Sequence, residues 1–408
     1  MVSNELPMRP ITDDEWPAYW HTITHTFHTD VREDESDQDR SVFEPERSLA
    51  VFDGDAVVAT TGIFSRDLSI PGAVVPAAHV TMVSVLATHR RRGLLNRMMR
   101  RQLRDVADAG REPIAVLWAS EEAIYGRYGY GPASWQIAID ADTREVRLPT
   151  TAPSGRLRLV APHDAVETLS HVYDTVRPRR PGFSSRPGEW WPHRLTDIER
   201  HRDGASSRRC VLHETAEGVT GYALYRVKKN WDDTGPNAEV RVEELVAADP
   251  AARAELWRFL FDLDLSRRIS AWALPVDEPL FHWVDNPRRL DRTYGSALYV
   301  RVVNLPTALA ARRYAAPVDL VFEVTDELLP ENAGRWRLTG DAEKARCERT
   351  TEPADLTLGI RELGAAYLGG TPLGYLASAG LVEGRPEAIA AASAAFGWHI
   401  APHAPEIF

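Results

Sequence analysis

The chain has 408 residues, of which 44% are hydrophobic and 26% charged, and its formal net charge is −11 at pH 7. These fractions exclude a disordered or collagen-like chain, and the length is enough for about two to three domains. The acidic balance argues against a general nucleic-acid binder, which carries a basic excess, and favours cationic small molecules as partners.

The N-terminal region and the cysteines indicate where the protein works. The apolar runs of the whole chain are shorter than the roughly 18 residues that a membrane helix needs. Residues 1–20 lack the basic and apolar stretches of a signal peptide. Cys210 and Cys347 lie far apart and outside any Cys-x-x-Cys motif, which argues against a disulfide framework or a zinc site. We therefore expect a cytoplasmic protein without a membrane anchor.

The first part of the chain alternates strand-like and helix-like patterns. Between residues 94 and 106 the apolar residues form one face of a helix with arginines on the other, and Gly110 is a typical stop. The acid-rich run 30–39 is interpreted as a solvated loop. Segments rich in Val, Ile, Thr and Phe, or continuously apolar, predict strands over 48–52, 56–65, 80–86 and 114–118.

A stretch rich in Pro, Thr, Ser and Gly, residues 144–158, has the composition of a linker and predicts a domain boundary. Further patterns follow it. Strands are predicted over 218–227, 298–303 and 319–324, and helices over 250–265, 306–314 and 386–396.

The most informative window spans residues 83–96, where a strand ends, a basic turn follows and Gly93 stands at the start of a helix. The first N–H groups of a helix have no internal partner, and the positive end of its dipole points at a ligand. Gly93 lets a phosphate approach the backbone closely, and neighbouring arginines can add charge-assisted hydrogen bonds. The window predicts an anion site; the alternative is a basic helix start that binds nothing.

This turn resembles the acyl-CoA pyrophosphate loop of the GNAT N-acetyltransferase superfamily, with Arg90 and Gly93 in place and Leu95 where Gly or Ala is usual. Residues 119–131 resemble the superfamily's later motif, in which Tyr125 is the tyrosine on a short helix before a Gly-Tyr pair. Considered alone, Tyr125 would equally well be a core residue. The two neighbouring tyrosines, Tyr128 and Tyr130, are interpreted as packing residues.

Together the two windows are similar to the signature of the Eis (enhanced intracellular survival) family of acetyltransferases. Further stretches that look like that family lie at 221–227, 263–270, 300–309 and 367–370, so the resemblance covers nearly the whole chain. It implies an α+β fold with mixed sheets, assembled as a homohexamer. The implied parts are a catalytic GNAT domain over 1–150, a second, non-catalytic GNAT-like domain over 156–298, and a sterol-carrier-protein-like domain over 299–408.

The chain offers its own check on the second GNAT-like domain. Residues 220–226 echo residues 61–66, and residues 242–247 with the helix that follows echo the window from Val83. Where the first copy has Arg-Arg-Gly at 91–93, the second has Ala-Ala-Arg-Ala at 251–254. Because the second copy lacks the glycine and most of the charge, we interpret it as structural rather than as a CoA site.

The resemblance also implies the site. Acetyl-CoA is the expected co-substrate, and no metal is expected. Tyr125 would be the general acid for the departing thiolate, and the terminal carboxylate of Phe408 would be the base for the amine. The implied cofactor contacts are Val83, Ser84, Val85, Arg91, Arg92, Gly93, Leu94, Leu95, Asn96, Ser120 and Glu121.

The leading hypothesis is direct acetyl transfer, in a ternary complex, to primary amines of cationic small molecules of the aminoglycoside or polyamine type, at one or several positions. Family members known for aminoglycoside acetylation have an acid just before the terminal Phe, whereas this chain has Ile407, with Glu406 one step back. Asp30 is a second candidate pocket acid. Two alternatives stay open: acetylation of protein lysines, and a carrier of apolar ligands with vestigial transfer, suggested by the apolar 356–381 region.

Overall fold

The computed structural model describes residues 5–149 and 154–408, so residues 150–153 of the predicted linker lie outside the described residues. The chain divides into two compact units. Within the described ranges, none of the helices combines the length and apolar character required to cross a membrane. Unit 1 comprises Met1–Ala133, Leu298–His399 and Phe408, and unit 2 comprises Ser134–Ala297 and Ile400–Ile407.

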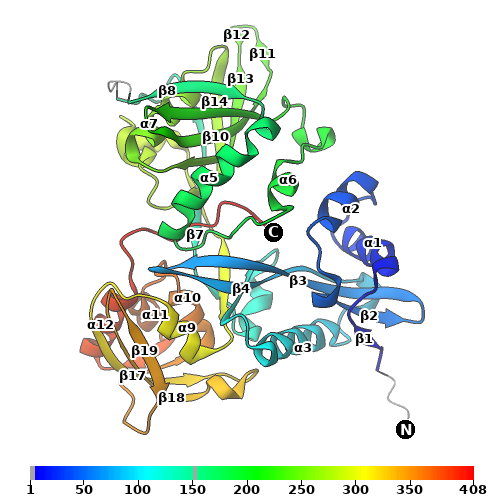
Figure 1. The fold of residues 1–408 in the computed structure, drawn as a ribbon, viewed down its shortest axis with the longest axis vertical. Coiled ribbons are helices and arrows are strands. Elements are labelled where there is room, and N and C mark those ends of the chain that lie inside the picture. Colours follow the sequence, from blue (N-terminus) through cyan, green and yellow to red (C-terminus); the bar gives the residue numbers. More distant parts are fainter. Residues whose placement is uncertain (1–4, 150–153) are drawn as a thin grey trace. The chain divides into compact units, whose positions relative to one another are not determined.

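The N-terminal part of unit 1 is built around a mixed sheet. Its strands are β1 (Met8–Arg9), β2 (Leu49–Asp53), β3 (Ala56–Ile70), β4 (Ala73–Val85), β5 (Ile114–Trp118), β6 (Gly131–Pro132) and β16 (Leu298–Val302). They lie in the order β1-β2-β3-β4-β5-β16-β6, with β4 and β5 parallel and the other neighbours antiparallel. Figure 1 labels β1 to β4 of this sheet. The strands predicted over 48–52, 56–65, 80–86 and 114–118 are confirmed.

The helices of this part are α1 (Trp16–Thr26), α2 (Glu33–Arg40), α3 (Leu94–Ala109) and α4 (Glu122–Tyr125). Helix α3 confirms the predicted apolar stripe, because Met98, Met99 and Leu103 are buried while the arginines at its outer face stay accessible. It packs against β2, β3 and β4. Gly110 ends it in the left-handed region at φ 65°, and its N–H donates to the carbonyl of Val106.

The acid-rich run predicted as a loop over 30–39 is helical from Glu33 on, as α2, so that prediction is wrong for residues 33–39. Three acids occupy its first turn, where the helix dipole favours negative charge, and Arg40 lies in its last turn. Arg40 pairs with Asp13, and the Trp16 indole donates to the Ser36 hydroxyl at 2.9 Å. The expected solvation does hold, since none of the residues of α2, all of them described, is buried.

The C-terminal part of unit 1 is a second mixed sheet with helices. Its strands are β17 (Val318–Thr325), β18 (Gly334–Gly340), β19 (Ala345–Arg349), β20 (Leu356–Gly359) and β21 (Val382–Gly384), in the order β19-β18-β17-β20-β21. Its helices are α9 (Leu305–Ala311), α10 (Ile360–Ala366), α11 (Leu373–Ser378) and α12 (Pro386–Phe396). The helix predicted over 386–396 and the strands predicted over 298–303 and 319–324 are confirmed, whereas the helix predicted over 306–314 ends at Ala311.

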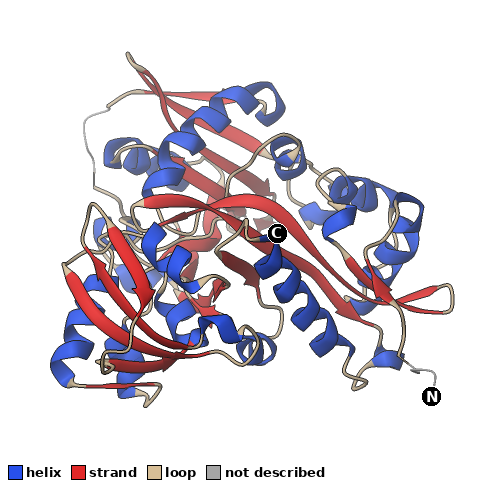
Figure 2. Ribbon diagram, turned by 60° about the horizontal axis from the view of Figure 1, so that its bottom comes forward, coloured by secondary structure: helices blue, strands red, loops and turns tan. Residues whose placement is uncertain are grey.

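Unit 2 repeats the topology of the N-terminal sheet. Its strands are β7 (Trp135–Asp142), β8 (Arg156–Val160), β9 (Arg209–Thr215), β10 (Gly218–Lys228), β13 (Ala238–Ala247), β14 (Ser266–Pro275) and β15 (Thr293–Ser296), beside the short hairpin of β11 (Trp231–Asp232) and β12 (Gly235–Pro236). The sheet order is β15-β7-β14-β13-β10-β9-β8. Figure 2 shows the strands of the protein in red and its helices in blue. Its helices are α5 (Val166–Val176), α6 (Trp190–Leu195), α7 (Pro250–Phe261) and α8 (Leu280–Trp283).

In the repeat, β10, β13, α7 and β14 follow one another as β3, β4, α3 and β5 do. Strands β13 and β14 are parallel, like β4 and β5, and α7 packs on β10 and β13. The strand predicted over 218–227 is confirmed, whereas the helix predicted over 250–265 ends at Phe261.

Two strands, β7 and β16, belong to a different sheet from the one that their position in the sequence suggests. Strand β7 comes before the predicted boundary but pairs with β14 and β15 in unit 2. Strand β16 follows the second segment but pairs with β5 and β6 in unit 1. Contiguous segments of sequence therefore do not coincide with the compact units at these two strands, because pairing across a sheet is independent of position along the chain.

Candidate active site

Strands β4 and β5 stop pairing partway along β4. Their last parallel pair joins His79 with Val116, and β4 runs on to Val85. A β-bulge follows: the register between β3 and β4 shifts between Thr60 and Gly62, and Met82 adopts a positive φ of 54°. The backbone from the bulge to Val85 is thus turned away from the regular β4–β5 ladder.

The Thr60 hydroxyl holds the bulge. It donates to the Met82 carbonyl at 2.7 Å, and it lies 2.6 Å from the Ser84 hydroxyl. Thr60 is fully buried, so these bonds form away from water, where an unmade hydrogen bond is costly. The conformation of residues 82–84 is therefore fixed before any ligand binds.

The basic turn ends in an open first helical turn. Arg91 and Gly93 have φ values of 63° and 77°, in the left-handed region that glycine adopts freely and arginine only at a cost. A Cβ at Gly93 would meet nothing within 4 Å, so the backbone conformation, not space, calls for glycine there. The first helical bond runs from Arg97 N–H to Gly93 O, and the N–H groups of 94–96 precede it.

A cavity of about 1000 Å³ opens at this turn. It brings together the two sequence windows, since both the strand end and turn at 83–96 and the later motif at 120–128 line it. Of the predicted site residues, Val83, Ser84, Val85, Arg91, Gly93, Leu94, Leu95, Asn96, Ser120, Glu121 and Tyr125 line the cavity. The remaining predicted cofactor contact, Arg92, is exposed and is not one of the described residues that line the cavity.

Leu95, the departure from the usual pattern, is half-buried and packs its side chain against the apolar core beneath α3. The longer side chain thus extends the core while the residue still borders the cavity. The backbone N–H, which a phosphate would contact, is unaffected by this choice of side chain.

Sequence reasoning missed part of the lining. Residues 26–28, at and just beyond the end of α1, border the cavity, and Phe27 is 48% exposed there. No local pattern marks them, because their role depends on how α1 lies on β3 and β4. His89, Arg90 and Arg127 also line the cavity, so with Arg91 the charged lining is mostly basic and suits an anionic ligand.

Tyr125 is buried at the end of α4, with 7% of its surface exposed. Burial, reinforced by the negative charge of Glu121, raises its pKa to about 12. Its ring lies edge-on to Tyr130, with centroids 6.2 Å apart. Tyr128 and Tyr130 are buried in the same apolar cluster, consistent with packing. The Tyr125 phenol is therefore protonated at neutral pH and in contact with the cavity.

Phe408 belongs to unit 1, where its ring lies 4.7 Å from that of His79. His79 is fully buried and forms the last β4–β5 pair. The chain terminus thus lies at the point where these two strands separate. Phe408 is not one of the described residues that line the cavity.

The two candidate pocket acids lie elsewhere. Asp30 is exposed and pairs with Arg32 at 2.9 Å, and Glu406 is buried in unit 2, where it pairs with Arg186 at 2.7 Å. Ile407, between Glu406 and the terminus, is 61% exposed. Among the described lining residues of the cavity, neither acid occurs.

The helix start of the second copy is built differently. Asp249 caps α7 by accepting the N–H of Ala252 at 2.9 Å, and Pro250 in the first turn has no N–H to offer. Of the amides in this first turn, all described, only that of Ala251 is left for a ligand. Strand β13 does keep a bulge, since Leu224 faces Glu244 while Tyr225 faces Val242.

Two further observations concern possible metal ligands and the cysteines. Within residues 5–149 and 154–408, no group of three or more His, Cys, Asp or Glu side chains is arranged to hold a metal ion. Cys210 and Cys347 are free thiols, both buried, and burial raises the pKa of each to about 12.

Known families match along the chain in the order of these parts. An acetyltransferase (GNAT) domain family matches residues 7–133, a second acetyltransferase (GNAT) domain family matches residues 182–302, and a sterol carrier protein domain family matches residues 305–405. With the mixed sheets and their helices, these matches define an α+β N-acetyltransferase of the GNAT superfamily. Enzymes of that superfamily use acetyl-CoA.

Whole-chain relatives narrow the class further. The chain is 46% identical over 407 residues to an uncharacterised N-acetyltransferase of Streptomyces avermitilis, covering 98% of this chain and 99% of the relative. It is 34% identical over 382 residues to N-acetyltransferase Eis of Mycobacterium tuberculosis, covering 90% of each. The crystal structure of Eis1 from Mycobacterium abscessus matches it with a TM-score of 0.85 at 31% identity, over 98% of this chain and 100% of that one. The chain belongs to the Eis family of GNAT acetyltransferases, which confirms the resemblance.

Proposed function

We propose that the enzyme transfers the acetyl group of acetyl-CoA directly to a primary amine of a cationic small molecule, of the aminoglycoside or polyamine type, at one or several positions. The observation that carries the proposal is the cavity at the first turn of α3, which joins open helix amides, Arg91 and Tyr125 in one space. Such a space offers both an anion site and a proton donor, the two features that acetyl transfer from a phosphorylated thioester needs.

The cofactor's pyrophosphate is assigned to the first turn of α3. The N–H groups of Leu94, Leu95 and Asn96 precede the first helical bond and border the cavity, and the helix dipole adds to their attraction for phosphate. The Arg91 guanidinium can add a charge-assisted bond. The bulged backbone from Val83 to Val85 is assigned to the pantetheine arm and the thioester carbonyl, and Ser120 and Glu121, which also line the cavity, are assigned to further cofactor contacts.

Tyr125 is assigned the role of general acid. When the amine nitrogen attacks the thioester carbon, a tetrahedral intermediate forms, and its collapse breaks the C–S bond. The departing sulfur takes a proton from the Tyr125 hydroxyl. A pKa of about 12 keeps that proton in place at neutral pH, so the acid is loaded whenever substrate binds.

The terminal carboxylate of Phe408 is assigned the role of base, which takes the proton from the attacking nitrogen. The contact of its ring with His79, at the last β4–β5 pair, supports this role because the thioester is assigned to the neighbouring end of β4. Holding the reacting groups in one arrangement can supply several kcal/mol of the barrier.

A cationic acceptor is supported by an acidic helix that is close in sequence to the cavity lining. Helix α2, with acids at 33–35, 37 and 39, begins shortly after the lining residue His28. Such a helix attracts polyamines to the cavity rim over about one Debye length. We also propose that unit 2 is non-catalytic, because Asp249 and Pro250 close the first turn of α7. The homohexamer implied by the family resemblance is a further expectation, which analytical ultracentrifugation tests.

The test is release of CoA thiol from acetyl-CoA with a panel of amines: kanamycin, spermidine and a lysine peptide. We expect intact enzyme to acetylate kanamycin or spermidine. The chain without Phe408 and the Tyr125→Phe variant should each lose about 10²-fold or more in kcat while remaining folded. Acetylation of the peptide alone would move protein lysines ahead as the substrate. Retention of full kcat without Phe408 would overturn the assignment of the base.

A further inference from the structure

The C-terminal tail, Ile400–Ile407, is fastened to unit 2 along its length. Arg180 donates to the Ala401 carbonyl at 2.9 Å and pairs with Asp277, which in turn accepts the Ala401 N–H at 3.0 Å. The His403 N–H donates to the Pro181 carbonyl at 2.8 Å. A Cβ at Gly182 would lie 2.7 Å from the His403 carbonyl oxygen, so a glycine is needed for this close approach.

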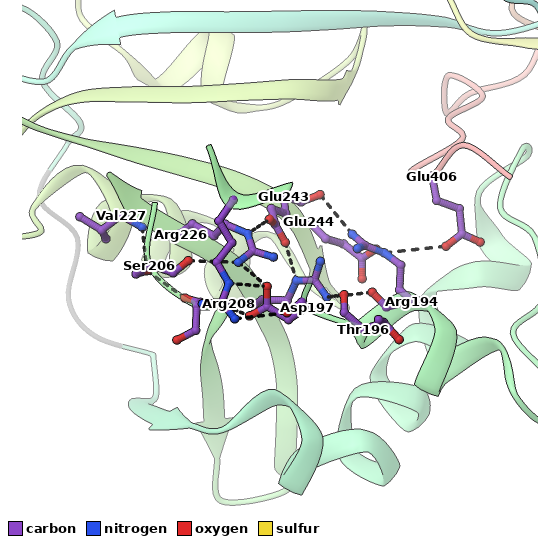
Figure 3. Close-up of polar contacts among 12 residues, drawn as sticks. Arg194, Thr196, Asp197, Ser206, Arg208, Arg226, Val227, Glu243, Glu244 and Glu406 are labelled. Carbon is purple, nitrogen blue, oxygen red and sulfur yellow. Dashed lines mark hydrogen bonds and ion pairs between the residues drawn. The ribbon is translucent and has the colours of Figure 1, made fainter. Parts of the chain in front are cut away.

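The last fastening is an ion pair in the interior. Arg186 donates from Nε to Glu406 at 2.9 Å, and its terminal nitrogens bond both oxygens of Glu244. The Arg186 and Glu244 side chains are each 1% exposed and that of Glu406 is 10% exposed. Arg194 lies beside both acids, and Figure 3 shows it between Glu244 and the tail. The two arginines and two glutamates balance in charge.

Arg186 is held so that it cannot follow the tail. Its guanidinium lies 4.0 Å from the ring centre of Tyr173 and 4.7 Å from that of Trp191. Tyr222 donates to Glu244 at 2.5 Å. Burial favours the neutral form of Glu244, but the attraction of Arg186 and Arg194 outweighs it and holds its pKa below the usual value. The position of Glu406 is therefore dictated by unit 2.

The ion pair also occupies a defined place in the second GNAT-like fold. Glu244 follows the bulge of β13, as Ser84 follows the bulge of β4. In the first copy the bulge borders the cavity, whereas in the second the corresponding stretch presents a carboxylate to Arg186, which binds the tail. The second copy thus retains the bulge and uses it to hold a segment of its own chain.

We infer that unit 2 serves as a holder for the tail, and that Glu406 is a positioning residue which, through its pair with Arg186, fixes where the Phe408 carboxylate lies. The inference rests on the proposed function, in which that carboxylate is the base. Only Ile407 lies between Glu406 and the terminal residue Phe408, so the ion pair limits the terminal group to a small volume. Glu406 therefore pairs with Arg186, whereas the sequence suggested that it could contact the substrate.

The test compares Glu406→Gln with Glu243→Gln in the full chain. Glu243 lies next to Glu244 and pairs with Arg208 and Arg226 (Figure 3), so its variant disrupts a similar ion-pair cluster without touching a tail side chain. With the amine that intact enzyme acetylates fastest, Glu406→Gln should lower kcat by about 10²-fold with little change in the KM for acetyl-CoA. Glu243→Gln should keep kcat within about twofold.

A second readout follows the tail without catalysis. Carboxypeptidase should release phenylalanine from Glu406→Gln about tenfold or more faster than from intact enzyme or Glu243→Gln, because release tracks opening of the tail. Should Glu406→Gln fail to fold, Glu406→Asp keeps the charge but shortens the reach, and a partial loss of kcat is expected. Equal kcat losses in the Gln variants, or unchanged phenylalanine release, would overturn the inference. The chain without Phe408 separates the two claims, because its full activity would refute the base itself.

Discussion

The first turns of α3 and α7 occupy corresponding places in two copies of one fold, and they differ in what they leave open. In α3 the N-cap is Gly93, which has no side-chain oxygen, and residues 94–96, whose amides precede the first helical bond, line a cavity. In α7 the Asp249 carboxylate accepts one amide and Pro250 removes another. We therefore propose that the first turn of the helix decides whether each GNAT-like copy can bind a phosphate.

The bulges of β4 and β13, which precede these helices, also differ between the two copies. The bulge of β4 is fixed by a hydroxyl, Thr60, which leaves the strand end uncharged. The bulge of β13 carries Glu243, and Glu244 follows it; each of these carboxylates is paired with arginines. A carboxylate there would repel the anionic cofactor, which supports the proposal that the second copy does not bind CoA.

The largest effect is expected from giving α3 an acidic cap like that of α7. Gly93→Asp places a carboxylate where phosphate is assigned and should weaken acetyl-CoA binding by about 30-fold, or about 2 kcal/mol. Gly93→Asn is the matched control, since asparagine has the same shape, no charge and tolerance of positive φ; its loss should be about threefold. Isothermal titration calorimetry measures both. Equal losses would show that backbone strain, and not charge, governs the turn.

Removing the hydroxyl that fixes the β4 bulge should have the next largest effect. Thr60→Val keeps the shape but leaves the Met82 carbonyl and the Ser84 hydroxyl without this partner, which should lower the free energy of unfolding by about 1 to 2 kcal/mol and raise the KM for acetyl-CoA. The control is Thr175→Val, whose hydroxyl bonds the His171 carbonyl on an exposed face. Chemical denaturation and steady-state kinetics supply the readouts, and an unchanged KM would remove the bulge from cofactor binding.

Uncapping α7 should cost stability alone. Asp249→Ala should lower the free energy of unfolding by about 1 kcal/mol, because it leaves the Ala252 N–H without its acceptor. Asp249→Asn preserves an acceptor and should cost less. Acetyl-CoA affinity, measured by calorimetry, should stay the same in both variants. A change in affinity or stoichiometry would mean that the second copy takes part in binding.

The smallest expected effect is an absence of pH response. An acid donates only while protonated, and its protonated fraction falls as the pH rises through its pKa. With a pKa of about 12 for Tyr125, owing to burial and to Glu121, kcat should show no falling limb from this residue below about pH 10. A falling limb near about pH 9 that disappears in Tyr125→Phe would contradict the raised pKa.

What the sequence could predict was mainly local. The basic turn, Gly93 and the α3 stripe are encoded within a few residues, and the same holds for Tyr125 and for the missing glycine of the second copy. Helix α2 was missed because a run of acids has no apolar periodicity, although its first-turn acids and Arg40 are favourable helix ends.

The features that the sequence could not predict depend on contacts between residues far apart in the chain. The exchange of β7 and β16 between the sheets, and the bond from Arg186 to Glu406 across 220 positions of sequence, leave no local pattern. Glu406 looked like a displaced substrate acid because its partner is invisible in the sequence. The cavity lining at 26–28 was missed for the same reason.

The central claim is that acetyl-CoA binds at α3 of the first copy and not at α7 of the second. A crystal structure of the enzyme with acetyl-CoA tests it most directly. We expect the pyrophosphate oxygens within hydrogen-bond distance of the amides of 94–96 and of Arg91, with the thioester beside the bulge of β4. Pyrophosphate density at Ala251 in the first turn of α7, or cofactor bound away from both helices, would contradict the account.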